Sequence, residues 1–190
     1  MGANTREFAN FVNDGLHWKK LAHYDQAGNT ATSFQFNSGL YQSGYDIYRI
    51  VGRVGGNQVS ANAGIEVEWI DGSGSRVTSG YYSGNFTYHS GAAYAQQAAQ
   101  NGSSGRIVVN TPTTASMMID ALYVPQDGHM YGFCRYHNQS SYMGVTVFSV
   151  RNNSSYAYGL RFNNNAGTNI TAIDFTTYGG NISGSLGGLS

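Results

Sequence analysis

The stretch SGYDIYRIVGRV, from Ser43 to Val54, decides the fold of this chain. Wound as a helix, it would mix apolar and charged side chains on every face, whereas an extended strand separates them into two faces. Tyr48, Ile50 and Val54 then share a face that is typical of a core. The opposite face carries Tyr45, Ile47, Arg49, Val51 and Arg53. The stretch therefore predicts a strand whose outer face is apolar enough to be covered by neighbouring protein.

The composition favours β structure in one large domain, with or without an arm. The 190 residues include 26 glycines and 15 tyrosines, and only 11% of them are charged. Such a mixture is typical of strands separated by tight turns. Ten basic residues balance ten acidic ones, so neither nucleic acid nor a membrane surface is an expected partner. The lone cysteine, Cys134, excludes an intrachain disulfide, and the opening MGANTREFANFV is unlike a signal peptide, so we expect a protein folded in a cytosol.

Short alternating patterns recur through most of the chain. The plainest is GIEVEWI, Gly64–Ile70, in which apolar residues alternate with Glu66 and Glu68. DGSG at 71–74 is a turn signal, and SRVTSGYY at 75–82 is the expected returning strand of a hairpin. About ten such segments predict an all-β fold, a two-sheet antiparallel sandwich. The predicted core-facing residues are Phe34, Phe36, Tyr48, Ile50, Ile65, Val67 and Trp69.

Two segments lack a strand pattern. GAAYAQQAAQ, residues 91–100, is rich in alanine and glutamine and is expected to form a short helix or an ordered loop. Residues 1–28 are expected to form an N-terminal anchoring arm ahead of a sandwich domain over residues 29–190, because they are too few to make a core alone. Packing on its own sandwich and docking on another chain are both open for this arm. Its expected anchoring residues are Phe8, Phe11, Val12, Leu16 and Trp18.

The sequence offers no convincing catalytic pattern. Glu66 and Glu68 share a strand face and could mimic the carboxylate pair of a glycosidase, but a solvated outer face is the favoured interpretation. The five histidines show no metal-ligand spacing such as HxxxH. No serine lies in a nucleophile motif, and Cys134 is interpreted as a small buried apolar residue. The sequence therefore predicts a protein that is not an enzyme and holds neither a cofactor nor a metal.

Tyrosines are the main candidates for binding. Four of them lie in the glycine-rich stretch SGYYSGNFTYHSGAAY, residues 79–94. Tyrosine rings suit wet protein interfaces and also stack on sugar rings, although some of these rings are expected to fill the core. The candidates for an oligomer or glycan interface are Tyr81, Tyr82, Tyr88 and Tyr94, together with Tyr45, Arg49 and Arg53.

Three segments carry a resemblance to a known group of proteins. They are YDIYRIVGRV, then SMMIDALYVPQDGHMYGFCRYHNQSSYMGVTVFSV, then NITAIDFTTYGGNISG. In order and pattern the chain resembles, from Phe34 to Gly184, a jelly-roll module of virion proteins of tailed bacteriophages, especially marine and cyanobacterial phages. Such proteins are capsid decoration (cement) proteins or tail-fibre-associated proteins. The opening GANTREFANFV resembles their anchoring start, whereas the closing SLGGLS departs from the final strand of the pattern.

The resemblance implies a structural protein of a phage particle, assembled in the host cytoplasm and located in the virion. Its expected partners are the major capsid protein or other virion proteins. A capsid decoration protein is favoured, because the chain has neither the repeats nor the heptads of a fibre shaft. A tail-associated adhesin that binds host glycans is the alternative. The resemblance also implies a homotrimer, whereas the low-charge, tyrosine-rich surface by itself predicts only an oligomer.

Overall fold

A computed structural model of the chain describes residues 18–31, 33–36, 41, 44–55, 63–89, 92–111, 116–137, 143–153, 157–164 and 170–181. In these residues twelve strands and one short 3₁₀ turn, Pro125–Asp127, are formed. The strands are β1 (Lys19–Ala31), β2 (Ser33–Phe36), β3 (Ile47–Gly55), β4 (Ala63–Ile70), β5 (Tyr81–His89), β6 (Ala92–Gly102), β7 (Gly105–Thr111), β8 (Ser116–Val124), β9 (His129–His137), β10 (Met143–Asn152), β11 (Gly159–Asn164) and β12 (Ile170–Gly180). Within the same ranges, no helix is long and apolar enough to cross a membrane.

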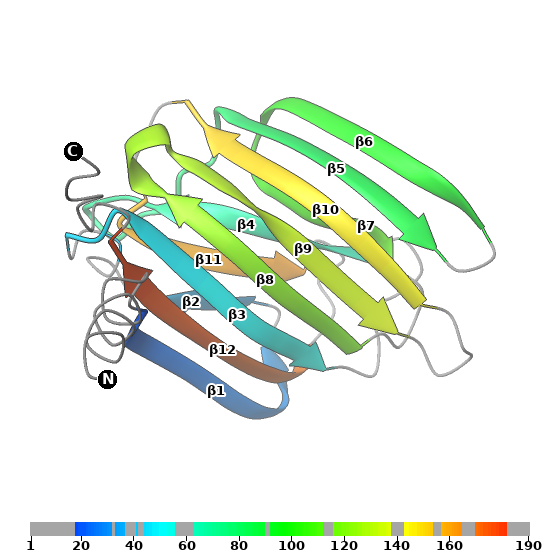
Figure 1. The fold of residues 1–190 in the computed structure, drawn as a ribbon, viewed down its shortest axis with the longest axis horizontal. Helices are drawn as coiled ribbons and strands as arrows, with labels where there is room; N and C mark the ends of the chain where they lie inside the picture. Colours follow the sequence, from blue (N-terminus) through cyan, green and yellow to red (C-terminus); the bar gives the residue numbers. More distant parts are fainter. Residues whose placement is uncertain are drawn as a thin grey trace, which may run out of the picture.

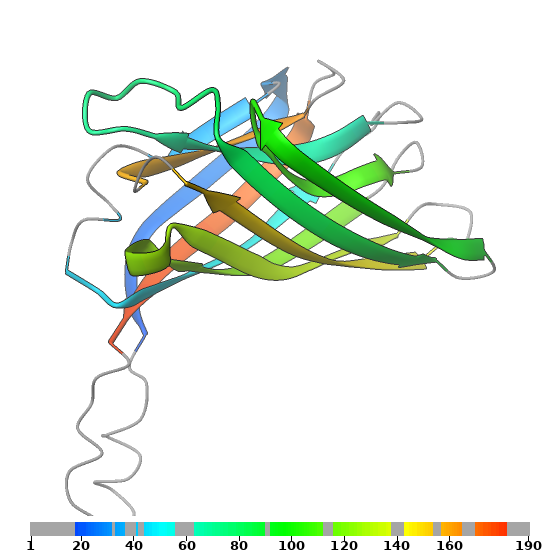
Figure 2. The same ribbon diagram turned by 90° about the horizontal axis from the view of Figure 1, so that it is seen from above.

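The strands form two sheets that pack face to face (Figures 1 and 2). The large sheet has eight strands in the order β1-β12-β3-β8-β9-β10-β5-β6, and the small sheet has four in the order β2-β11-β4-β7. Every strand pair in both sheets is antiparallel. The predicted all-β fold, an antiparallel two-sheet sandwich, is confirmed.

Eight of the strands form a jelly-roll frame. The first four strands of this frame pair with the last four in reverse order, as β1 with β12, β2 with β11, β3 with β8 and β4 with β7. This nested pairing is the arrangement of a jelly roll, so the predicted fold type is also confirmed. The hairpins β5–β6 and β9–β10 are additions to the frame, joined to each other through β10 and β5. We call these four strands the extension, because they lengthen the large sheet beyond β8 (Figure 1).

The core between the sheets confirms the predicted strand register. Each of the seven residues predicted to face it is at most 3% exposed. One end is aromatic: the Phe34 ring stacks on Phe162 at 5.0 Å between centroids, and Phe175 lies 4.6 Å from Phe34. Gly52 occupies a core-facing position of β3 where a Cβ atom would meet the Phe175 ring at 2.2 Å. The glycine of the opening stretch is therefore required by a ring packed directly on the backbone.

Burial of ionisable groups predicts a loss of stability at alkaline pH. Burial raises the pKa of the Tyr41 and Tyr81 phenols and of the Cys134 thiol, because their charged forms would lose hydration. In the unfolded chain these groups ionise near pH 10 and about pH 8.5. Since the folded pKa values are the higher ones, the stability they contribute is complete below pH 8.5 and is lost as the pH rises. We expect the free energy of unfolding to fall by up to about 1.4 kcal/mol per pH unit for each group.

Urea unfolding between pH 7 and pH 11 measures this loss. Cys134→Ala should remove the first part of the decline, between pH 8.5 and 10, and leave the later part, which belongs to the tyrosines. Unfolding free energy that stays level or rises up to pH 11 would contradict the prediction.

The predicted arm is shorter than the sequence indicated. Residues 19–28 belong to β1, which pairs with β12 from Lys19 opposite Gly179 onward. The side chain of Tyr24 stacks on Phe34 in the core. These residues join the sandwich because the edge of β12 offers backbone partners that a sequence pattern does not reveal. Residues 1–17 lie outside the described part of the chain, so a truncation that tests the arm must stop before β1.

One further expectation was wrong, and another was correct only in part. Residues 92–100, all but the first residue of the expected helix or loop, belong to the strand β6. Pairing with β5 outweighs the helix propensity of alanine and glutamine. The chain does turn back after β4, since Ile70 and Arg76 form an antiparallel bridge and the Val77 N–H donates to the Trp69 carbonyl. The return ends there, because residues 78–80 connect to β5 of the large sheet, which begins at Tyr81. Asp71 shapes the turn by accepting hydrogen bonds from the backbone N–H groups of Ser73 and Ser75, both at 2.9 Å, and the Ser73 side chain lowers the pKa of Asp71.

Candidate functional site

Exposed apolar side chains gather on the outer face of the extension and on the strand beside it. In the described part of the chain, seven large hydrophobic residues are exposed, and six of them lie on β5, β8, β9 and β10. Phe133 is 51% exposed, and Val147 is 47% exposed. Because strands expose alternate residues, these six share the outer face of the large sheet. We call them the apolar patch: Phe86, Tyr88, Met118, Tyr131, Phe133 and Val147.

The strand register places the centre of the patch in one row across the sheet. Phe86 on β5 is opposite Val147 on β10, and Val147 is opposite Phe133 on β9. The row continues from Phe133 to Asp120 on β8 and then to Val51 on β3. Directly paired side chains lie about 5 Å apart, so the row is a continuous surface. The patch therefore runs from the extension onto the frame, as far as the outer face of the opening stretch.

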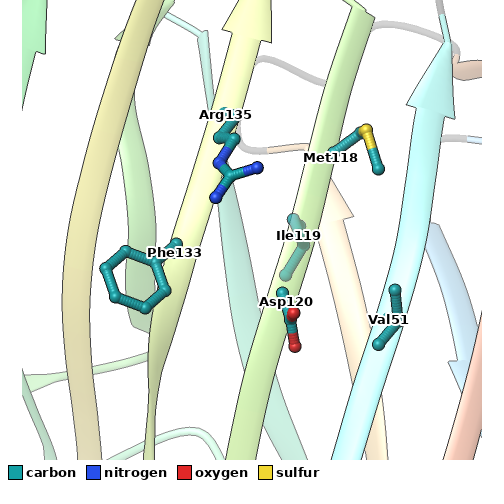
Figure 3. Close-up of a pocket in the computed structure, with 6 residues that line it drawn as sticks. All are labelled: Val51, Met118, Ile119, Asp120, Phe133 and Arg135. Atoms are coloured by element: carbon teal, nitrogen blue, oxygen red, sulfur yellow. The ribbon is translucent and has the colours of Figure 1, made fainter.

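A shallow hollow lies at the frame end of this row. It is lined by side chains or backbone from β3, β8 and β9, and its volume is about 90 Å³. Figure 3 shows Met118 and Asp120 on β8 between Val51 on β3 and the pair Phe133 and Arg135 on β9. Small-molecule and cofactor sites usually measure about 300–1,000 Å³. The hollow is too small for such a ligand and can receive one protruding side chain.

Two of the charges beside the hollow, those of Arg49 and Asp120, are paired with each other. Arg49 donates two hydrogen bonds to Asp120, Nε to Oδ1 at 2.9 Å and Nη2 to Oδ2 at 2.6 Å. These hydrogen bonds raise the pKa of Arg49. Because both side chains are about half exposed, the pair contributes little to stability. It does neutralise two charges next to the patch, which lowers the cost of covering them with a partner.

The outer face of the small sheet is polar and closed by ion pairs. Glu68 is 3% exposed. It accepts a hydrogen bond from Arg76 Nε at 2.8 Å and one from Arg161 Nη1 at 2.5 Å. Ser104 donates its hydroxyl hydrogen to Glu66 at 2.7 Å. The prediction of a solvated glutamate pair was wrong for Glu68, because the two arginines fold over it and shield its carboxylate from water.

The two sheets thus present different outer faces. The small sheet carries carboxylates held by arginine and serine side chains, whereas the extension carries exposed rings and aliphatic chains. No group of three or more His, Cys, Asp and Glu residues within the described ranges is placed to hold a metal ion. The candidate binding surface is therefore the apolar patch, on the outer face of the large sheet.

The predicted interface residues are scattered rather than gathered. Tyr88 is 58% exposed and belongs to the patch, but Tyr81 is 0% exposed and donates its hydroxyl hydrogen to the backbone oxygen of Val77 at 3.0 Å. Tyr81 is therefore a core residue and the prediction for it was wrong. Tyr82 is half-buried, and the side chain of Tyr94 in β6 lies outside what the structure describes.

The remaining candidates lie in two places. In the strand region, Tyr45 is half-buried against the core, Arg49 is paired with Asp120, and Arg53 is exposed on the outer face of β3. In the arm, Trp18 is half-buried just before β1. The other four anchoring residues lie outside the described part of the chain: Phe8, Phe11, Val12 and Leu16.

Sequence reasoning missed the centre of the patch. The sequence analysis did not name as candidates four of the patch residues, Phe86, Phe133, Val147 and Met118. The strand β9 nevertheless has apolar residues on its outer face, the feature that drew attention to the opening stretch. In HMYGFCRYH one alternating set is buried with Met130, and the other exposes the rings of Tyr131 and Phe133. A strand that exposes large rings opposite a buried face indicates a second contact beyond its own core.

No protein-family model and no curated protein matches the chain. Similar solved structures include the CBM2 module of the evolved Dit of Lactobacillus casei BL23 phage J-1, with 10% identity over 84% of this chain and 76% of that chain, at a TM-score of 0.26. Structures of the Gt and Gx strains of infectious bursal disease virus share 10% and 12% identity. They cover 88% and 84% of this chain but only 42% and 41% of theirs, at TM-scores of 0.17 and 0.16. All three come from a phage or a virus, but similarity this low establishes no family, so the fold rests on the strand topology.

Proposed function

We propose that this chain is a structural protein of a tailed bacteriophage particle, and that it decorates the capsid by docking its apolar patch on another virion protein. The observation that carries the proposal is the exposed row Phe86–Val147–Phe133 on one outer face of a sandwich whose other face is polar. Exposed apolar surface concentrated on one face marks an interaction site. The resemblance of the sequence to virion jelly-roll modules supplies the setting.

The chemistry of the patch favours a protein partner. Val147 lies between the rings of Phe86 and Phe133, and the unbranched apolar side chain of Met118 lines the hollow together with Phe133. Sugars are held by flat rings with hydrogen-bonding groups around them, whereas aliphatic side chains pack well only against other apolar groups. From β5 to β8 the patch crosses three strand intervals, or about 14 Å. That width suits the central part of a protein interface surrounded by a polar rim.

A second candidate function is a tail-associated adhesin that binds host glycans. The observation in its favour is that Tyr88 and Tyr131 are both exposed on the same face, and tyrosine rings stack on sugars. This candidate makes a different prediction, since a soluble host polysaccharide would then bind to the patch itself.

Replacing Phe133 by serine is expected to weaken binding to the particle at least about tenfold, because the ring is the largest apolar group at the centre of the patch. The measurement is co-sedimentation of purified protein with virions made from a genome that carries a stop codon in this gene. Stability should change by less than about 0.5 kcal/mol, since the ring is half exposed.

Tyr158→Ser is the matched control, because Tyr158 is 39% exposed but lies outside the patch. It should bind as well as the unchanged protein. Equal binding by Phe133→Ser would contradict the proposal. Binding of soluble host polysaccharide that Phe133→Ser abolishes, with binding to the particle unchanged, would replace it with the adhesin.

A further inference from the structure

We propose that β6 pairs edge to edge with β6 of a second copy of this chain. The two strands are antiparallel and related by a two-fold axis, so the large sheets of the two copies join into one continuous sheet. This inference goes beyond particle docking, because it concerns a different surface and a different partner. It rests on the backbone edge of the extension and not on the apolar patch.

The edge that β6 presents carries neither of the two side-chain features that most often discourage pairing, a charge or a proline. β6 is the last strand of the large sheet and pairs with β5 alone among the described strands. Over its eleven residues, AAYAQQAAQNG, it has no charged residue and no proline. An edge strand exposes a row of backbone N–H and C=O groups, and proteins ordinarily block such a row with charges, prolines, short strands or bulges. The pairing with β5 has a register shift near each end of β6, so the regular part of the edge is residues 95–99. This stretch, without charge or proline, is a template for another strand.

The other three sheet edges in the described structure differ from β6. β1 carries the charged residues Lys19, Lys20 and Asp25. β2 has only four residues. β7 carries Arg106 and packs against β5 and β10 of the large sheet. Each of these edges has a feature that discourages pairing, so the uncharged edge is confined to the end of the extension.

A second copy is the occupant that this edge fits best. In an antiparallel pair of identical strands through the regular stretch, position 97 lies on the two-fold axis and position 95 is opposite position 99. All five positions then find a partner, and no like charges meet because the strand has none. The contact is self-complementary and closed, which is the commonest symmetry of protein oligomers.

The two-fold axis also relates the proposed contact to the apolar patch. Position 96 pairs with Phe86, and position 98 pairs with Gly84, both on the exposed side of β5. An axis perpendicular to the sheet leaves the outer faces of both copies on the same side. The β5 strands of the two copies would be three intervals apart, about 14 Å. Two apolar patches would then face one direction, and a particle could bind both at once with a gain in avidity.

This contact is two-fold, whereas the resemblance implied a homotrimer. Sedimentation velocity of the full chain at micromolar concentration separates the two. The expected mass is twice the monomer mass of 20.5 kDa. A monomer or a trimer over the whole concentration range would overturn the proposal. Hydrogen exchange of the unchanged chain is the second measurement: backbone amides of β6 should become protected as the concentration rises, and amides that exchange equally fast at all concentrations would also overturn it.

Charge variants identify the strand. Gln96→Lys combined with Ala98→Lys should weaken association at least about tenfold, because lysines from the two copies would meet across the axis. The corresponding Gln96→Glu with Ala98→Glu should be equally weak, and an equimolar mixture of the two variants should recover the dimer mass. Thr78→Lys with Asn153→Lys is the matched control, since it adds the same charge at exposed positions outside the edge, and it should remain dimeric. Lysine variants that stay dimeric, or a mixture that stays monomeric, would contradict pairing through β6.

Discussion

Trp69→Ala is expected to lower the free energy of unfolding by about 3–5 kcal/mol. The indole is fully buried at the centre of the sandwich, with its ring 5.6 Å from Tyr81 and 5.5 Å from Tyr123 between centroids. Removing it leaves a cavity that these rings cannot fill, because their hydroxyl groups are fixed. Tyr81 binds Val77, and Tyr123 accepts a hydrogen bond from the backbone of Ala157. Equilibrium urea unfolding measures the difference.

Trp69→Phe is the control for this prediction. The buried indole Nε1 has no hydrogen-bond partner among the residues that the structure describes, so phenylalanine removes an unsatisfied donor while it keeps most of the apolar area. Its cost should therefore be well below that of alanine. A cost below about 0.5 kcal/mol for Trp69→Ala would show that the register of β4 is wrong by one residue.

Glu68→Ala is expected to cost about 2–4 kcal/mol, the second-largest effect. The carboxylate has a relative side-chain exposure of 4%, and Arg161 has one of 17%, so removal of Glu68 leaves a largely buried guanidinium without its counter-charge. Arg76 has 49% exposure and can turn to water, which keeps the cost below that of a fully buried pair.

Arg76→Ala separates the two arginines. It should cost less than about 1 kcal/mol, because Arg76 is half exposed and Glu68 retains Arg161. Thermal unfolding of the three proteins under one buffer condition gives the comparison. A larger loss for Arg76→Ala than for Glu68→Ala would mean that Arg161 contributes little to the pair.

The frame of the fold was predictable because its strands have one buried face. Period-two alternation around Ile50 and Val67 gave the correct register, and both side chains are buried as expected. The edge strands were not predictable in the same way. In β1 and β6, at the two ends of the large sheet, backbone pairing with a neighbour sets the conformation, and a single sequence does not contain that information. Propensity therefore placed a helix or loop where β6 lies.

The candidate site was predictable only in part. The outer face of the opening stretch was expected to be covered, and the patch does reach it through Val51. The larger part of the patch is built by register between three hairpin strands, so Phe86, Val147 and Phe133 become neighbours only after β10 has paired with both β5 and β9. The abundance of tyrosines suggested Tyr81 as an interface residue instead. That prediction was wrong because a tyrosine hydroxyl can find a hydrogen-bond partner in a core as well as at an interface.

The extension unites the proposals made for this protein. It lengthens one sheet of a jelly-roll frame, carries most of the apolar patch on its outer face and ends in the uncharged strand β6. Its inner face is more polar than the frame core, with Thr87 and Thr146 joined by a 2.8 Å hydrogen bond. The extension thus adds less to the apolar core than the frame does, which fits a role in contacts between molecules.

Hydroxyl-radical footprinting of the protein free and bound to virions tests the central claim most directly. Met118 and Phe133 are both more than half exposed in the free protein, and their oxidation is predicted to fall severalfold on binding. Oxidation of Tyr158, which lies outside the patch, is predicted not to change. Unchanged oxidation of Met118 and Phe133 in the bound protein, with protection of Tyr158 instead, would contradict docking through the apolar patch.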